Sequence, residues 1–276
     1  MKNRLAEHLT TWKLWYAIPG FFALMVSSLI PTLGSMLLGP ENKTGMAFLV
    51  PVQFIAFAVL ALGGIALLAR RWPSAADLGL KKSLTWKQIL LLIVVFAVSH
   101  FGFWLLTLGA PSDPGVAGRY FDEQNLGGPL LPAVFVLFAS VILAPVCEEL
   151  LYRGAILRPI HDAIARRGST VLAAVVSILV AAVAFALPHL GGSLTGREAA
   201  AYMITGIAFG PVYVLTGSMT AAMVSHSLQS CFAFGQILVL GHGDAHVSPI
   251  LYILVFGCPV IVFFVARGLR AVFPRG

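Results

Sequence analysis

Long apolar runs separated by short polar segments fill most of this sequence. A hydrocarbon core about 30 Å thick requires about 20 helical residues, because each residue rises 1.5 Å. Runs of about this length recur between the charged residues and predict an all-α, polytopic membrane protein. We expect about eight transmembrane helices, at Leu14–Leu38, Ala47–Ala69, Ile89–Leu108, Leu131–Tyr152, Val171–His189, Ala199–Leu215, Met219–Leu240 and Ile250–Ala266.

The composition excludes the soluble classes of protein. Hydrophobic residues make up 59% of the 276 residues and charged residues 11%, whereas an ordinary soluble domain has about 25% charged residues. The three cysteines, Cys147, Cys231 and Cys258, form no Cys-x-x-Cys pair and are predicted to be buried free thiols. Without a repeat or a linker, we expect a single integral membrane domain over residues 1–276.

The distribution of basic residues predicts the topology. Fifteen of the 18 Lys and Arg residues fall in alternate loops and in the two tails, which the positive-inside rule assigns to the cytoplasm. We therefore expect both termini to be cytoplasmic, in a plasma or inner membrane. The net charge of +7 is explained by these loops, so we expect the lipid bilayer as a partner and no nucleic acid.

A polar stretch follows the fourth predicted span. Between Gly154 and Gly168, charged residues and histidine alternate with isoleucine and leucine. This pattern predicts a short interfacial helix that lies on the membrane surface. Its polar face would carry Arg158, His161, Asp162, Arg166 and Arg167.

Two adjacent carboxylates end the fourth span. A charged side chain near the middle of a membrane helix costs about 2.5–3.5 kcal/mol, so such residues are candidate functional groups. Glu149 and Arg153 are four residues apart and share a helix face, which predicts an ion pair. Glu148 points elsewhere and would be free to act. Alternatively, both carboxylates lie solvated at the interface and pair with Arg153 and Arg158.

Two histidines in the later spans complete a candidate site. His189 follows Phe185 by four residues, so the two rings share a face and the phenyl ring can position the imidazole. His226 lies in the seventh predicted span. One carboxylate with two imidazoles can activate water as a general base with polar partners, or can hold zinc. We assign the remaining histidines to packing or to a solvated loop: His100, His242 and His246.

The order of these residues resembles a known family. Glu148-Glu149-x-x-x-Arg153, then Phe185-x-x-x-His189, then His226 is similar to the three-motif signature of the CAAX-protease and bacteriocin-processing group of intramembrane proteases, which includes the type II CAAX prenyl endopeptidases. The similarity covers about residues 144–230, with Pro145 before the first motif and Gly154 after it.

The resemblance implies a peptidase activity, with a catalytic core at about residues 131–240. The first glutamate would activate water, the second would support the site together with the arginine, and the two histidines would complete it. The substrate would be a membrane-associated peptide or protein. We favour a metal-capable site, in which Glu148, His189 and His226 could hold a divalent ion such as zinc.

One position departs from the family pattern. The third motif usually ends in Asn or Asp four residues after the histidine, and Ser230 stands there in this chain. A hydroxyl offers one donor where an amide offers two, so the oxyanion would be stabilised less strongly, or by Gln229 or a backbone N–H. Two alternatives follow: a non-catalytic protein of the same fold that binds a partner peptide or confers bacteriocin self-immunity, and a proton-coupled transporter.

Overall fold

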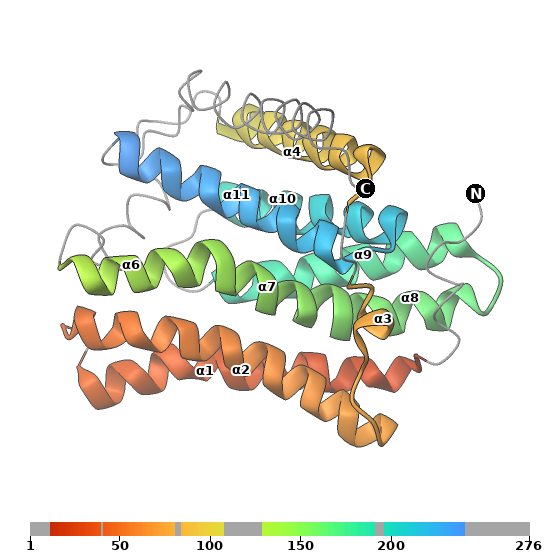
Figure 1. The fold of residues 1–276 in the computed structure, drawn as a ribbon, viewed down its shortest axis with the longest axis horizontal. Helices are drawn as coiled ribbons and strands as arrows, with labels where there is room; N and C mark the ends of the chain where they lie inside the picture. Colours follow the sequence, from red (N-terminus) through yellow and green to blue (C-terminus); the bar gives the residue numbers. More distant parts are fainter. Residues whose placement is uncertain (1–11, 40, 81–83, 108–128, 191–195, 241–276) are drawn as a thin grey trace, which may run out of the picture.

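The protein is helical throughout the part that the structure describes. The structure is a computed structural model, and it describes residues 12–39, 41–80, 84–107, 129–190 and 196–240. In Figure 1 the long helices lie side by side along one direction. The helical elements of the described residues, long and short, are η2 (Leu14–Tyr16), α1 (Ala17–Leu38), α2 (Lys43–Ala69), α3 (Ala75–Leu78), α4 (Trp86–Thr107), α6 (Leu130–Phe138), η3 (Ala139–Leu143), α7 (Ala144–Glu149), η4 (Leu150–Leu157), α8 (Arg158–Ala165), α9 (Thr170–Ala186), η5 (Leu187–Leu190), α10 (Gly196–Thr216) and α11 (Met219–Leu240).

Within the described residues, helices lie at the first seven predicted spans, although some of their bounds differ from those predicted. Four helical stretches are long and apolar enough to cross a membrane, namely Leu14–Leu38, Lys43–Ala69, Leu130–Ala165 and Thr170–His189. Two shorter apolar helices cover Trp86–Ser99 and Tyr202–Thr216. The predicted span Ile250–Ala266 lies outside the described residues. The chain is thus an integral membrane protein, while its orientation and its cellular membrane stay predictions.

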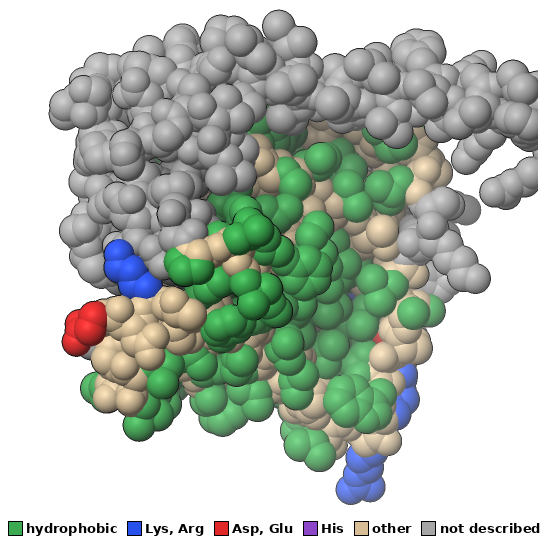
Figure 2. Space-filling model, turned by 60° about the vertical axis from the view of Figure 1, so that its left-hand side comes forward, with side chains coloured by type: hydrophobic (Ala, Val, Ile, Leu, Met, Phe, Trp, Pro, Cys, Tyr) green, Lys and Arg blue, Asp and Glu red, His purple; other side chains and the backbone are tan. Residues whose placement is uncertain are grey.

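Large apolar side chains cover the outer surface of the bundle. Leu37, Leu67 and Val171 are 83%, 81% and 74% exposed. Figure 2 shows such side chains spread over most of one face, with lysine and arginine at its margins. A continuous apolar surface of this kind is too large for a monomeric protein in water, and it fits contact with lipid.

One helix is much longer than predicted. The stretch Leu130–Ala165 is continuous over 36 residues, whereas the predicted span ended at Tyr152. Glu148 and Glu149 therefore lie near the middle of this helix, not at its end. The π-helical segments η3 and η4 flank α7, which carries both glutamates. Such π-helical turns are rare and frequently occur at functional sites.

The predicted interfacial helix is wrong. Its polar residues Arg158, His161 and Asp162 belong to α8 and are 2%, 2% and 5% exposed. An Arg158 amino group donates to the Tyr213 hydroxyl over 2.7 Å, and Arg158 Nε lies 3.7 Å from Asp162 Oδ2. The guanidinium also lies over the Trp12 ring, 5.4 Å from its centroid. The Arg158 guanidinium thus has partners from other elements, which a local sequence pattern does not show, whereas Asp162 is paired within its own helix.

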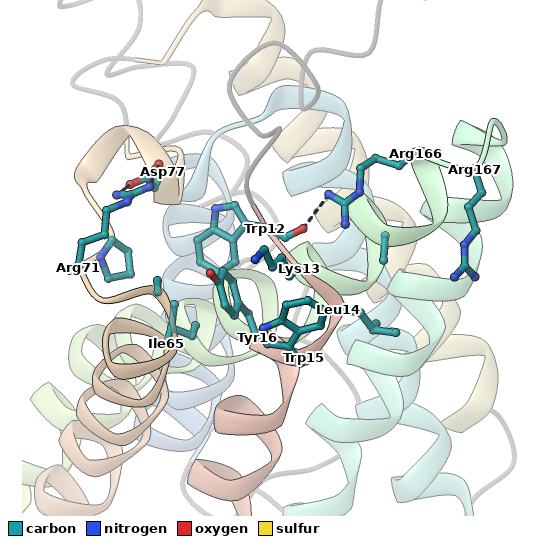
Figure 3. A pocket seen from close by; sticks show the side chains of 13 residues that line it. Trp12, Lys13, Leu14, Trp15, Tyr16, Ile65, Arg71, Asp77, Arg166 and Arg167 are labelled. Carbon is teal, nitrogen blue, oxygen red and sulfur yellow. Dashed lines mark hydrogen bonds and ion pairs between the residues drawn. The ribbon is translucent and has the colours of Figure 1, made fainter.

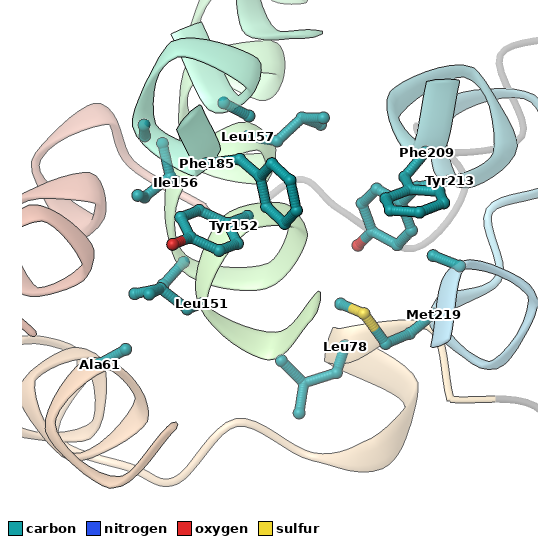
Figure 4. Packing of buried hydrophobic residues seen from close by; sticks show 14 of the residues in the cluster. Ala61, Leu78, Leu151, Tyr152, Ile156, Leu157, Phe185, Phe209, Tyr213 and Met219 are labelled. Carbon is teal, nitrogen blue, oxygen red and sulfur yellow. The ribbon is translucent and has the colours of Figure 1, made fainter. Parts of the chain in front are cut away.

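The core between η4, α9, α10 and α11 is aromatic. Figure 4 shows Tyr152 and Phe185 facing Phe209 and Tyr213, with Met219 beside them. Among the cysteines, Cys147 is buried as predicted, but Cys231 is exposed. Cys258 lies outside the described residues.

Candidate active site

Glu149 lies at the centre of a buried polar cluster. Its Oε1 accepts from an Arg153 amino group over 2.9 Å and from His226 Nδ1 over 2.9 Å. Glu149 and Arg153 are both fully buried. The predicted ion pair between them is therefore present, and α11 adds an imidazole to it. Because a carboxylate can only accept, the His226 proton in this bond lies on Nδ1.

Glu148 is buried beside the same imidazole. It is 6% exposed, and its Oε2 lies 3.6 Å from His226 Nε2. This separation is longer than a direct hydrogen bond. The His226 ring thus lies between the two carboxylates, bonded to Glu149 and close to Glu148. Of the pair, Glu149 has its charge balanced by Arg153, and Glu148 keeps its oxygens for other partners.

Phe185 brings the second histidine to this cluster. Its ring centroid lies 5.2 Å from that of His189 and 5.5 Å from that of His226. His189 Nδ1 donates to the Phe185 carbonyl oxygen over 2.8 Å, which leaves Nε2 as the free position of the ring.

Residues on one face of α10 line the site, although they were not among the predicted site residues. Tyr202 stacks on His189 with ring centroids 4.0 Å apart, and Phe209 stacks on His226 at 4.6 Å. Between them, the Gly206 carbonyl accepts from Arg153 over 2.9 Å. These residues recur at helical spacing on one face, which was a usable signal. Aromatic residues are so common in membrane helices that this spacing did not stand out.

Two polar atoms of the cluster have no hydrogen-bond partner among the described residues. They are Glu149 Oε2 and Arg153 Nε, and both are buried. Buried polar groups nearly always have partners.

Gly206 allows α10 to lie directly against α9. A Cβ added at Gly206 would lie 3.0 Å from Ala182 Cα and 3.2 Å from its Cβ, whereas one at Gly102 would meet only Ile204 side-chain atoms, the nearest at 3.8 Å. We expect Gly206→Ala to lower the free energy of unfolding by about 1–3 kcal/mol through overpacking, and to loosen the Arg153 bond. Thermal unfolding in detergent measures this effect. The matched control Gly102→Ala should keep wild-type stability; equal stability of both variants would contradict the close packing.

The predicted roles of the oxyanion donors and of the metal ligands stay predictions. Gln229 and Ser230 lie within one turn of His226 on α11 and are half-buried. The described residues contain no group of three or more His, Cys, Asp or Glu side chains that could hold a metal ion. The metal-binding role of Glu148, His189 and His226 stays a prediction. His100 lies in α4, but its side chain is outside the described part, as are His242 and His246.

The fold and the site together describe a helical membrane protein with a buried cluster of carboxylate, imidazole and guanidinium groups. Residues 129–232 match the model of the family described as Type II CAAX prenyl endopeptidase Rce1-like. The resemblance inferred from the three motifs is therefore confirmed over this part of the chain. Comparisons with curated proteins and with solved structures gave no significant match.

Proposed function

We propose that this protein is an intramembrane peptidase, in which Glu148 activates water to hydrolyse a peptide bond of a membrane-associated substrate. The observation that supports this proposal is the difference between the two glutamates. Glu149 accepts from Arg153 and His226, so its charge is balanced. Glu148 is 6% exposed and lies 3.6 Å from His226 Nε2, where it can accept a proton from water.

The reaction requires a base, a neighbouring acid and stabilisation of an oxyanion. Glu148 takes a proton from water as the water oxygen attacks the carbonyl carbon of the peptide bond. The tetrahedral intermediate then expels the amine, which takes up the proton, and the products are a carboxylic acid and an amine. His226, held by Glu149, and His189, held by the Phe185 carbonyl, are positioned to donate to or accept from the reacting groups.

The depth of the site sets its substrate class. The glutamates lie near the middle of a 36-residue candidate membrane helix, and the rings of Phe185 and Phe209 pack against the neighbouring His226 imidazole. A peptide must therefore approach within the membrane or from its edge. A membrane-associated segment meets this requirement, whereas a freely soluble peptide would have to leave water first.

Isotope incorporation tests the proposal against the non-catalytic alternative. The purified full chain in proteoliposomes would be incubated in ¹⁸O-labelled water with a set of lipid-anchored peptides. A hydrolase gives a shortened product with one ¹⁸O atom in its new carboxylate, as measured by mass spectrometry. Peptide that binds without cleavage would instead favour a binding or immunity protein, an alternative kept open by Ser230 in place of the usual amide.

Chelation separates the two forms of the mechanism. Because the described side chains form no metal-ligand group of three, we expect EDTA or 1,10-phenanthroline to leave the turnover of the purified protein unchanged. The measurement is turnover together with the metal content of the same sample. Loss of activity on chelation, with recovery on adding zinc, would overturn the metal-free form and restore Glu148, His189 and His226 as ligands.

A further inference from the structure

A pocket far from the glutamates lies where several membrane helices end. It has a volume of about 790 Å³ and is lined by η2, by the C-terminal ends of α2 and α8, and by the segment that leads into α3. Three candidate spans begin or end here, because Leu14–Leu38 starts, Lys43–Ala69 ends and Leu130–Ala165 ends at this level. The pocket therefore lies at the height of lipid headgroups.

The lining is basic and aromatic. Four basic side chains and a single carboxylate contribute charge to the lining, which gives a net charge of +3: Lys13, Arg71, Arg166 and Arg167 against Asp77. Three aromatic side chains, those of Trp12, Trp15 and Tyr16, complete the wall. Tryptophan and tyrosine are enriched at the membrane interface, and basic pockets between membrane helices bind anionic headgroups.

The basic side chains differ in how far their charge is compensated. Arg71 forms an ion pair with Asp77, and the hydrogen bond from Arg71 holds the pKa of this carboxyl well below its ordinary value. Arg166 donates to the Trp12 carbonyl over 2.7 Å, and Lys13 lies over the Trp15 ring. The charges of Lys13, Arg166 and Arg167 are not neutralised by any ion pair within the described residues. Figure 3 shows Arg166 and Arg167 on one side of Trp12 and Arg71 on the other.

A row of exposed apolar side chains runs from this pocket along one face of α1. Leu14, Ile18, Phe22 and Met25 recur on one face of η2 and α1 and are 52%, 65%, 55% and 70% exposed. A charged pocket above an exposed apolar face matches a molecule with an anionic head and hydrocarbon chains. A soluble anion would bind in the pocket but would not need the exposed apolar face beside it.

We propose that the pocket formed by Trp12, Lys13, Arg166 and Arg167 binds the phosphate headgroup of an anionic phospholipid, whose acyl chains lie along the exposed face of α1. The proposal does not depend on the proposed peptidase activity. Each uncompensated cation near the surface strengthens binding by about fivefold. Removing two of them should therefore weaken binding by roughly 30-fold.

Native mass spectrometry of the full chain tests this inference. Detergent-solubilised protein would be titrated with phosphatidylglycerol, with phosphatidylcholine and with inorganic phosphate. We expect retention of phosphatidylglycerol over phosphatidylcholine, and a roughly 30-fold weaker affinity in the double variant Lys13→Gln/Arg167→Gln. The control Lys43→Gln removes one positive charge about 40 Å away, at the other end of α2, and should bind as the wild type does.

Three outcomes would overturn the proposal. Equal retention of the two lipids would show that the protein does not prefer an anionic headgroup. Wild-type affinity in the double variant would show that the lipid does not bind in this pocket. Displacement of the lipid by millimolar inorganic phosphate would reassign the pocket to a soluble anion. The charge-conserving variant Lys13→Arg/Arg167→Lys should keep binding, and thermal unfolding of each variant shows that the fold is intact. Loss of lipid binding with unchanged peptide hydrolysis would leave the proposed function standing.

Discussion

Glu148→Gln is expected to lower the turnover of a membrane-associated peptide by about 10²-fold or more while leaving the protein folded. Glutamine has nearly the same shape as glutamate but cannot take a proton from water at neutral pH. Because Glu148 Oε2 lies 3.6 Å from its nearest imidazole nitrogen, the substitution breaks no direct bond to His226. The rate of product formation and the unfolding temperature, measured on the same preparation, separate catalysis from stability.

A matched control makes this result specific to the site. Glu41 is an exposed glutamate just before α2, so Glu41→Gln removes the same charge without approaching the cluster. It should retain wild-type turnover. If Glu148→Gln is as active as Glu41→Gln, Glu148 is not the base.

Arg153→Ala is expected to have the largest effect on stability, about 3–5 kcal/mol. The substitution leaves Glu149 buried without its guanidinium partner and removes the bond to the Gly206 carbonyl. The charge would then have to be stabilised by His226 alone. Thermal unfolding in detergent would measure the loss, with Arg167→Ala as the control at an exposed arginine, which should change stability by less than about 0.5 kcal/mol.

A double variant tests the cause of that loss. Glu149→Gln combined with Arg153→Met removes both charges and should recover part of the lost stability, because no uncompensated charge stays buried. Recovery is measured against Arg153→Ala under the same conditions. If Arg153→Ala unfolds at the wild-type temperature, the buried pair does not stabilise the fold.

Local spacing was enough to predict half of the site. Glu149 and Arg153 are neighbours on one helix, and Phe185 and His189 on another, so four-residue spacing alone placed each pair together. The contact between His226 and Glu149 joins residues far apart in the sequence. The family resemblance placed His226 in the site, but spacing could not show which glutamate its Nδ1 would contact.

The wrong prediction of an interfacial helix has a physical cause. Arg158 and Asp162 were predicted to lie at a membrane surface because charged residues usually require water. In the fold, Tyr213 from α10 and Trp12 from the N-terminal side provide the partners that water would otherwise provide. For Arg158, such compensation is visible only when the helices are packed.

The Arg153 bond to the Gly206 carbonyl limits what a mutational scan can reveal. This acceptor belongs to the backbone, so no side-chain substitution deletes it, and alanine scanning of α10 would underestimate the contribution of this helix to the site. The bond depends on the register of α10 against η4, because inserting one residue turns a helix by about 100°. Insertions and deletions before Gly206 would therefore be far more damaging than substitutions on the same turn.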